Sequence, residues 1–322
     1  MRRNAPNLLL TGLVSGLLCV VLLAGACGGS ADNEPRAATA STASAPPTTA
    51  PSNVAPSTST TLDTSPRTTL VVESDPDALA ATIADAEREL RSPDLTDAAA
   101  RQSAMLAQEA YRAISIQPEL TEAVVAAVPA NLRDAVRANA EATTELRRLT
   151  KPAKALPAWR IVPPAPADEL YGYYRAAETE FGVPWAYLAA IHLVETRMGR
   201  IRGTSTAGAR GPMQFIPSTW EAFGEGDIES NRDAIRAAAR YLKHNGAPQK
   251  MANALYNYNH SDRYVRAVTL HAEVMLADEQ AASSAGRSGG VPGAYRGYHQ
   301  WQVWYRLPDG DVMLPEGWSN TG

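Results

Sequence analysis

A single carboxylate, Glu195, follows a strongly apolar stretch that is predicted to be helical. The stretch reads AAIHLVETRMG, and Leu188 and Ile191 stand seven and four residues before Glu195. This spacing places the acid on the same helical face as the two aliphatic side chains. Because a protein core excludes an ionised carboxylate unless it is paired, we expect Glu195 either to pair with Arg197 or Arg200 or to be a general acid. In the second case burial raises the pKa of its carboxyl group toward neutral pH, as general acid catalysis requires.

A metal site is the first alternative to weigh for this helix. His192 stands three residues before Glu195, and a His-x-x-Glu spacing can chelate a metal on one helical face. A zinc site needs further ligands. The two cysteines, Cys19 and Cys27, both lie near the N-terminus, and no second pair of histidines is spaced to help. The sequence therefore predicts no metal, no other cofactor and no disulfide.

The segment after this helix supplies groups that are suited to a sugar. It reads STAGARGPMQFIPSTW and begins at Ser205. Gly208 and Gly211 let the backbone turn tightly and approach a ligand closely. Gln214 provides an amide with both donors and an acceptor for an N-acetyl or hydroxyl group. The segment is therefore a candidate wall of a sugar-binding groove.

Three acids downstream of Glu195 are alternatives for a second catalytic carboxylate. Glu221 ends a Ser-x-x-Glu spacing that is typical of a capping box, so a structural role is expected for it. Asp227 and Asp233 are the others, and Asp233 follows Asn231, a predicted N-cap, where an acid complements the helix dipole. None of the three is favoured as a second acid.

The N-terminus has the pattern of an export signal. Residues 1–27 contain Arg2 and Arg3, an apolar run and the sequence LLAGAC, which resembles a bacterial lipobox that ends at Cys27. The run is too short for a stable transmembrane span. In residues 28–74 the amino acids Ala, Pro, Ser and Thr predominate, and such a composition predicts a disordered tether.

The fold class that the remaining segments predict is mainly α. Residues 75–150 carry apolar side chains at helical spacing and no catalytic motif, which indicates a helical region. A proline-rich linker at 151–167 separates this region from a second helical domain at 168–280. Residues 281–322 begin with small residues and end in an aromatic segment around LPDGD, which predicts a short β-hairpin with a Pro-Asp-Gly turn.

Charge excludes one class of partner. The formal net charge is −4 at neutral pH, and the chain contains no run of basic residues. Removal of the two arginines of the signal would make the charge −6. A nucleic-acid partner is therefore not expected.

Four motifs in the second helical domain resemble, in their order, the catalytic domain of bacterial lytic transglycosylases, which are relatives of goose-type lysozyme. The motifs are VETRMG, STAGARGPMQFIPSTW, DAIRAAARYLKHNG and ALYNYNHSDRYVRAV. The resemblance implies a lysozyme-like helical catalytic domain at 168–280, in which Glu195 is the single catalytic acid. It places Ser205 beside that acid, where its hydroxyl could orient the carboxyl group.

The same resemblance implies which residues bind the substrate. Besides Ser205, the residues that match the family's sugar groove are Met213, Gln214, Tyr258 and Asn259. Tyr258 also shares a helical face with Met251 and Leu255, so an ordinary core position stays open for it. The chain departs from the family at Ser261, where Gly is frequent, and at Pro212, where Leu is common.

The resemblance also implies an activity. The family cleaves the β-1,4 bond between N-acetylmuramic acid and N-acetylglucosamine in peptidoglycan and forms 1,6-anhydro ends without consuming water. The alternatives are a muramidase that hydrolyses the same bond and a non-catalytic peptidoglycan-binding lipoprotein. The expected partners are peptidoglycan glycan strands and a membrane, reached through a lipid on Cys27. We expect a monomeric protein on the outer face of the cytoplasmic membrane.

The aromatic residues near the C-terminus lie outside the resemblance. We expect the rings between Tyr295 and Trp318 to cover an apolar flank of the helical domain. The alternative is a sugar-binding platform. If Trp301 and Trp304 were in one strand, they would point to opposite faces because they are three residues apart, so only one of them could stack on the glycan.

Overall fold

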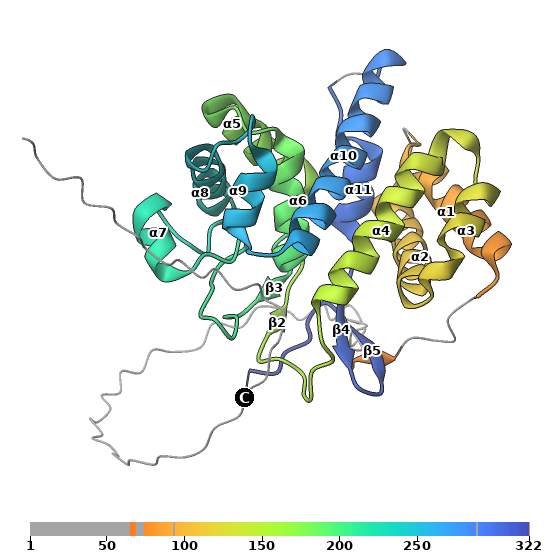
Figure 1. Cartoon of the computed structure of the whole chain (residues 1–322), viewed down its shortest axis with the longest axis horizontal. Helices are drawn as coiled ribbons and strands as arrows, with labels where there is room; N and C mark the ends of the chain where they lie inside the picture. The colour runs from red at the N-terminus through yellow and green to blue at the C-terminus, as the bar shows by residue number, and fades with distance from the viewer. Residues whose placement is uncertain (1–64, 69–73, 93, 288, 322) are drawn as a thin grey trace, which may run out of the picture. The chain divides into compact units, whose positions relative to one another are not determined.

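The computed structural model describes residues 65–68, 74–92, 94–287 and 289–321 (Figure 1). The predicted signal, Cys27 and nearly all of the predicted tether lie outside these residues. The described chain is mainly helical and has an antiparallel hairpin near its C-terminus, which confirms the predicted fold class. The domain boundaries that composition suggested stay predictions. Within the described ranges, no helix combines the length and apolar character needed to cross a bilayer.

The N-terminal helical region forms from four helices joined by short turns. They are α1 (Pro76–Leu90), α2 (Asp97–Ile116), α3 (Thr121–Ala127) and α4 (Arg133–Leu149), with 3-10 turns at Pro118–Leu120 and Ala130–Leu132. The side chains of Asp75 and Thr96 accept hydrogen bonds from the backbone amides of Asp77 and Ala99, and so they cap the first two helices. The apolar faces of all four helices join one hydrophobic core with the helices that follow.

Seven further helices build the part of the chain in which the four motifs lie. They are α5 (Ala167–Phe181), α6 (Trp185–Thr196), α7 (Pro217–Phe223), α8 (Asn231–His244), α9 (Met251–Tyr258), α10 (Asp262–Ser284) and α11 (Gly293–Gln300). Helix α6 is the most enclosed of them, since ten of its twelve residues are buried. Helix α10 packs against both α4 and α6, and Figure 1 shows it running between them. It therefore joins the N-terminal helices to the helix that carries Glu195.

Two small sheets close the structure. Strand β2 (Arg160–Ile161) pairs with β3 (Ile201–Arg202), and the hairpin of β4 (Val303–Leu307) and β5 (Gly310–Leu314) receives β1 (Arg67–Thr68) on the β5 edge. The hairpin turns at Pro308 and Asp309, as the Pro-Asp-Gly pattern predicted.

A second hydrophobic core lies under the hairpin. It is built from Ala153, Trp159, Ile161, Val303, Tyr305, Leu314 and Trp318. Three of these residues belong to the segment 151–167, which was expected to be a linker. That segment is therefore not a free connection between the two helical parts, because it packs against the C-terminal hairpin.

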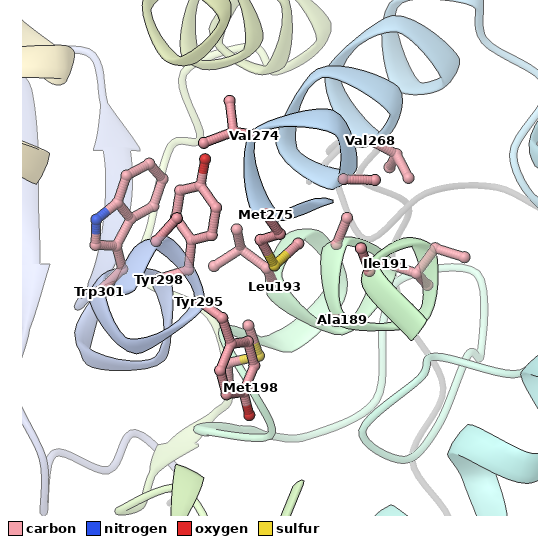
Figure 2. Packing of buried hydrophobic residues seen from close by; sticks show 14 of the residues in the cluster. Ala189, Ile191, Leu193, Met198, Val268, Val274, Met275, Tyr295, Tyr298 and Trp301 are labelled. Carbon is pink, nitrogen blue, oxygen red and sulfur yellow. The ribbon is translucent and has the colours of Figure 1, made fainter. Parts of the chain in front are cut away.

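The aromatic C-terminal residues are core residues, as the preferred interpretation expected. Tyr295, Tyr298 and Trp301 are 0%, 3% and 5% exposed and belong to the main core. Figure 2 shows Tyr298 and Trp301 beside one another, and their ring centroids are 4.9 Å apart. Trp301 is the C-cap of α11 and not part of a strand. Strand alternation therefore does not relate its direction to that of Trp304, which lies in β4.

Two predicted helix caps are wrong. Helix α7 begins at Pro217 with Ile216 as its N-cap and no side-chain capping bond, so no capping box involves Glu221, which is exposed. The proline fixes the first turn without needing a cap. The N-cap of α8 is Ser230 rather than Asn231, because the Ser230 side chain accepts from the Asp233 amide.

We predict that Trp301→Ala destabilises the protein. Removal of a fully packed aromatic ring leaves a cavity, which costs about 3–5 kcal/mol of the free energy of unfolding. Chemical denaturation measures this change. The matched control is Tyr256→Ala, because Tyr256 is 41% exposed, and it should change stability by less than about 1 kcal/mol. Equal effects of the two substitutions would contradict a core role for Trp301.

Candidate active site

Glu195 sits in the last turn of α6, and the backbone reverses directly after it. Arg197 and Met198 have positive φ values of 54° and 60°, and Gly199 follows with 79°. The hydroxyl of Thr196 donates to the Pro212 carbonyl at 2.6 Å and accepts from the Gly199 amide at 3.1 Å. This bridge joins the end of α6 to the following motif and so fixes where the acid stands.

The carboxyl group of Glu195 is enclosed and has one phenol as its hydrogen-bond partner. Glu195 is 7% exposed, and Tyr264 of α10 donates a hydrogen bond to its Oε1 at 2.8 Å. Burial raises the pKa of Glu195 from 4.5 to about 7, while the Tyr264 hydrogen bond opposes the rise. The carboxyl group is therefore poised to hold or release a proton near neutral pH.

The ion pair that the sequence allowed for Glu195 does not form. Arg200 is bound to Glu316, and Arg197 donates to the Leu193 carbonyl at 2.6 Å. Both guanidinium groups are thus bound to other acceptors, although Arg197 lines the same cavity as the acid. Tyr264 is 69 residues from Glu195 in the chain, so its contact depends on the packing of α10 against α6. Tyr264 lies within the motif ALYNYNHSDRYVRAV, but the motif alone assigned it no role.

The side chains of Tyr258 and Gln214 both donate hydrogen bonds to backbone carbonyls of the segment 211–213. The Tyr258 hydroxyl donates to the Met213 carbonyl at 2.7 Å, and its ring is parallel to that of Tyr264, with 6.5 Å between centroids. Gln214 has a positive φ of 50°, and its side-chain amide donates to the Gly211 carbonyl at 3.0 Å. Its Oε1 has no protein partner within the described residues. That oxygen is therefore a buried acceptor, and Gln214 does not line the cavity beside Glu195.

The other predicted site residues are more structural than expected. Met213 is 0% exposed, so its side chain packs in the core and does not face a groove in this structure. The Ser205 hydroxyl accepts from the amides of Ala207 and Ala209 at 3.2 and 2.9 Å, which closes the loop in which it lies. Asn259 is 5% exposed and caps the end of α9. Roles for these three residues in binding a sugar stay predictions.

A cavity of about 140 Å³ opens beside Glu195. Its walls come from distant parts of the chain: Val194 of α6, Arg197 at the C-cap of α6, Leu146 of α4, Trp159, and Val303, Trp304, Tyr305 and Arg306 of the hairpin. Glu195 is the single carboxylate among the described residues that line it. Arg306 and Trp159 lie outside the motif of the acid, so their positions in the sequence do not predict that they are its neighbours.

The His-x-x-Glu spacing does not build a metal site. The Nδ1 of His192 is 2.7 Å from the Tyr174 hydroxyl, and burial lowers the pKa of the imidazole to about 3. His192 is therefore a neutral core residue. The part of the chain that the structure describes contains no group of three His, Cys, Asp or Glu side chains that could hold a metal ion.

Comparison with known proteins places these residues in a family. The transglycosylase SLT domain family matches residues 172–272. A membrane-bound lytic murein transglycosylase F from Thiobacillus denitrificans is 34% identical over 79 residues, which are 24% of this chain and 17% of that protein. The similarity thus spans less than a fifth of the relative's length. No solved structure matches the chain.

The matched span contains Glu195, Tyr264 and the groove residues that the motifs suggested. It ends before the hairpin and begins after the N-terminal helices. Residues 172–272 therefore match the transglycosylase SLT domain family, and this part of the chain is similar to a bacterial lytic transglycosylase.

Proposed function

We propose that this chain cleaves the β-1,4 bond between N-acetylmuramic acid and N-acetylglucosamine in peptidoglycan and leaves 1,6-anhydro ends. The observation that carries the proposal is the buried carboxyl group of Glu195. Its pKa is about 7, and the residue lies within the span that matches the SLT domain family. A pure binding protein has no use for an acid held at this pKa. The reaction needs one group that is an acid first and a base afterwards, and a pKa near neutral pH suits both steps.

Glu195 performs both proton transfers in this proposal. Its proton passes to the glycosidic oxygen as the bond from that oxygen to C1 of muramic acid breaks. The carboxylate that results then takes the proton of the 6-hydroxyl of the same sugar, while O6 forms a bond to C1. Tyr264 donates its hydrogen bond to the carboxylate in the interval, which stabilises the charged form. No water is consumed, and Glu195 ends as it began.

The described residues support a single carboxylate for this chemistry. An inverting hydrolase places a second carboxylate about 6.5–9.5 Å from the first to activate water. Asp233 is engaged at the start of α8, where it accepts from the Asp227 amide at 3.1 Å and pairs with Arg232. These contacts lower the pKa of Asp233, mainly through the Asp227 amide. Asp233 is therefore not proposed as a second catalytic carboxylate. Analysis of the products distinguishes the proposed reaction from hydrolysis by a muramidase.

The substrate contacts and the anchor are also proposals. Gln214 and Tyr258 would bind the glycan next to Glu195, with Ser205, Met213 and Asn259 shaping the loop and helix end around them. The lipobox resemblance supports lipidation of Cys27, and a relative of this domain is by its name membrane-bound. We therefore place the chain on the outer face of the cytoplasmic membrane, as a monomer.

We predict that Glu195→Gln abolishes most of the turnover. The amide keeps the shape of the side chain but cannot deliver a proton, and general acid catalysis contributes ~10²–10⁴-fold. Turnover of purified peptidoglycan, followed by mass analysis of the released fragments, measures the loss. Glu221→Gln is the matched control, because Glu221 is exposed, and it should retain full turnover. Reducing ends in place of anhydro ends would show that the protein is a muramidase. Normal turnover of Glu195→Gln would remove Glu195 from the reaction.

We predict that kcat/KM falls as pH rises through about 7, because Glu195 must start protonated. The Tyr264 hydrogen bond lowers the pKa of Glu195, so Tyr264→Phe raises this pKa and moves the falling limb to higher pH. Tyr256→Phe, at an exposed ring, leaves the limb in place. The measured quantity is the position of the limb and not the height of the profile. A limb that stays or moves to lower pH in Tyr264→Phe would show that the phenol does not tune the acid.

We predict that Cys27→Ser releases the protein from the membrane. A hydroxyl in place of the thiol offers no sulfur for lipid attachment, so the chain should move from the membrane fraction to the soluble fraction after cell lysis. Its helical circular dichroism signal should not change, because none of the helices in the described part of the chain contains Cys27. Retention in the membrane fraction would show that another segment anchors the chain.

A further inference from the structure

The cavity beside Glu195 continues into a second one of about 130 Å³. The two share a wall made of Leu146, Thr150, Arg197, Trp304, Tyr305 and Arg306. The second cavity reaches away from the acid to α2 and the end of α4. We call the two together the arginine recess, because four guanidinium groups line it: Arg112, Arg147, Arg197 and Arg306.

The positive charges of the recess exceed the negative charges that line it. Arg112 and Arg147 both donate to Oδ2 of Asp311, at 2.8 and 2.6 Å. Arg197 donates to the Leu193 carbonyl, and Arg306 donates to the carbonyls of Arg147 and Thr150, each at 3.1 Å. Among the described lining residues, the carboxylates are Asp311 and Glu195, and Glu195 is protonated below about pH 7. The recess therefore carries an excess of positive charge.

Burial of these guanidinium groups disfavours their charged form. Burial lowers the pKa of Arg112 and of Arg197 to about 10, and the proximity of the guanidinium groups contributes. The Nε of Arg112 and the hydroxyl of Thr143 are buried on the wall of the recess without a protein partner within the described residues. Buried donors of this kind usually have an acceptor. The Arg112 guanidinium is held in place by the Trp304 ring, whose centroid lies 3.5 Å away.

We propose that the arginine recess binds a carboxylate of the peptide that muramic acid carries. The proposal rests on the proposed function, since it concerns the substrate of Glu195. The lactyl group that bears this peptide is attached to the sugar whose bond is cleaved, so its first carboxylates lie close to the acid. Guanidinium groups bind carboxylates with two parallel hydrogen bonds, which makes arginine better suited than lysine to such a site.

The recess adds a preference that the SLT domain does not supply by itself. Arg112, Arg147 and Arg306 lie outside residues 172–272, and only Arg197 lies inside them. The N-terminal helices and the hairpin would therefore select glycan strands that carry peptides over strands from which the peptides have been removed.

The test compares Arg306→Gln with the unchanged chain on three glycans. Arg306 suits the test because it donates to carbonyls and not to Asp311, so the pairs of Arg112 and Arg147 remain. The three glycans are peptide-bearing strands, strands without peptides, and peptide-bearing strands whose carboxylates are amidated. We expect kcat/KM on the first to fall roughly tenfold, as the loss of a charge-assisted hydrogen bond predicts. The other two should be cleaved equally by both proteins.

Two controls separate recognition from folding. Arg148→Gln removes a guanidinium from α4 that pairs with Glu145 at 3.0 Å and does not line the recess, so all three glycans should be cleaved normally. Lys151→Gln removes an exposed charge at the rim, where the fold is not at risk, and should weaken cleavage of peptide-bearing strands by a smaller factor. Thermal unfolding of each variant reports the state of the fold.

A binding measurement distinguishes failure of this inference from failure of the proposed function. Calorimetry with short peptide-bearing and peptide-free glycans measures affinity without turnover. If Arg306→Gln lowers affinity and kcat/KM equally on all glycans, the recess is not a carboxylate site. The same conclusion follows if the variant lowers them on no glycan. Selective loss of affinity for the peptide-bearing glycan, in a chain that cleaves no glycan, would support the recess and overturn the proposed activity.

Discussion

Burial of one carboxyl group, that of Glu195, is the constraint on which the site depends. The rise of its pKa from 4.5 to about 7 corresponds to about 3 kcal/mol, at about 1.4 kcal/mol per pH unit. Below pH 4.5 the folded and unfolded chains both hold this proton. Between pH 4.5 and 7 only the folded chain holds it, so the contribution of Glu195 to stability falls as pH rises. The surrounding packing must offset this cost, and nine of the other eleven residues of α6 are buried and contribute to that packing.

The packing that encloses Glu195 extends well beyond the SLT domain. Helix α10, which carries Tyr264, is held between α6 and α4, and α4 belongs to the N-terminal helices. The side chain of Gln108 in α2 exchanges two hydrogen bonds with the backbone of Gln302, at 2.8 and 3.0 Å, and so ties α2 to the segment before the hairpin. Removal of the N-terminal helices or of the C-terminal hairpin would therefore expose the core around the acid. The helical region that carries no catalytic motif therefore supports the position of Glu195.

The sequence predicts the local features of the fold and site, and it misses those that depend on packing. Helical periodicity and the Pro-Asp-Gly turn predicted the mainly helical chain and its hairpin, and the apolar spacing before Glu195 predicted that the acid is buried. Tyr264 could not be assigned, because its contact with Glu195 spans 69 residues and depends on the position of α10. Met213 was expected in a groove, yet its side chain is fully buried, since motif resemblance does not specify which way a side chain points.

The Trp304 ring of the hairpin contacts a guanidinium group, which is a different role from that of a platform on which a sugar stacks. A platform needs an open aromatic face, and Arg112 occupies one face of this ring at 3.5 Å from its centroid. The ring instead fixes a guanidinium that would otherwise lose conformational freedom on binding an anion. Asp311, on the neighbouring strand, holds the same arginine and Arg147 from the other direction. In the function that we propose, the hairpin thus orients charges toward the substrate's peptide, while residues 172–272 hold the acid that would act on its glycan.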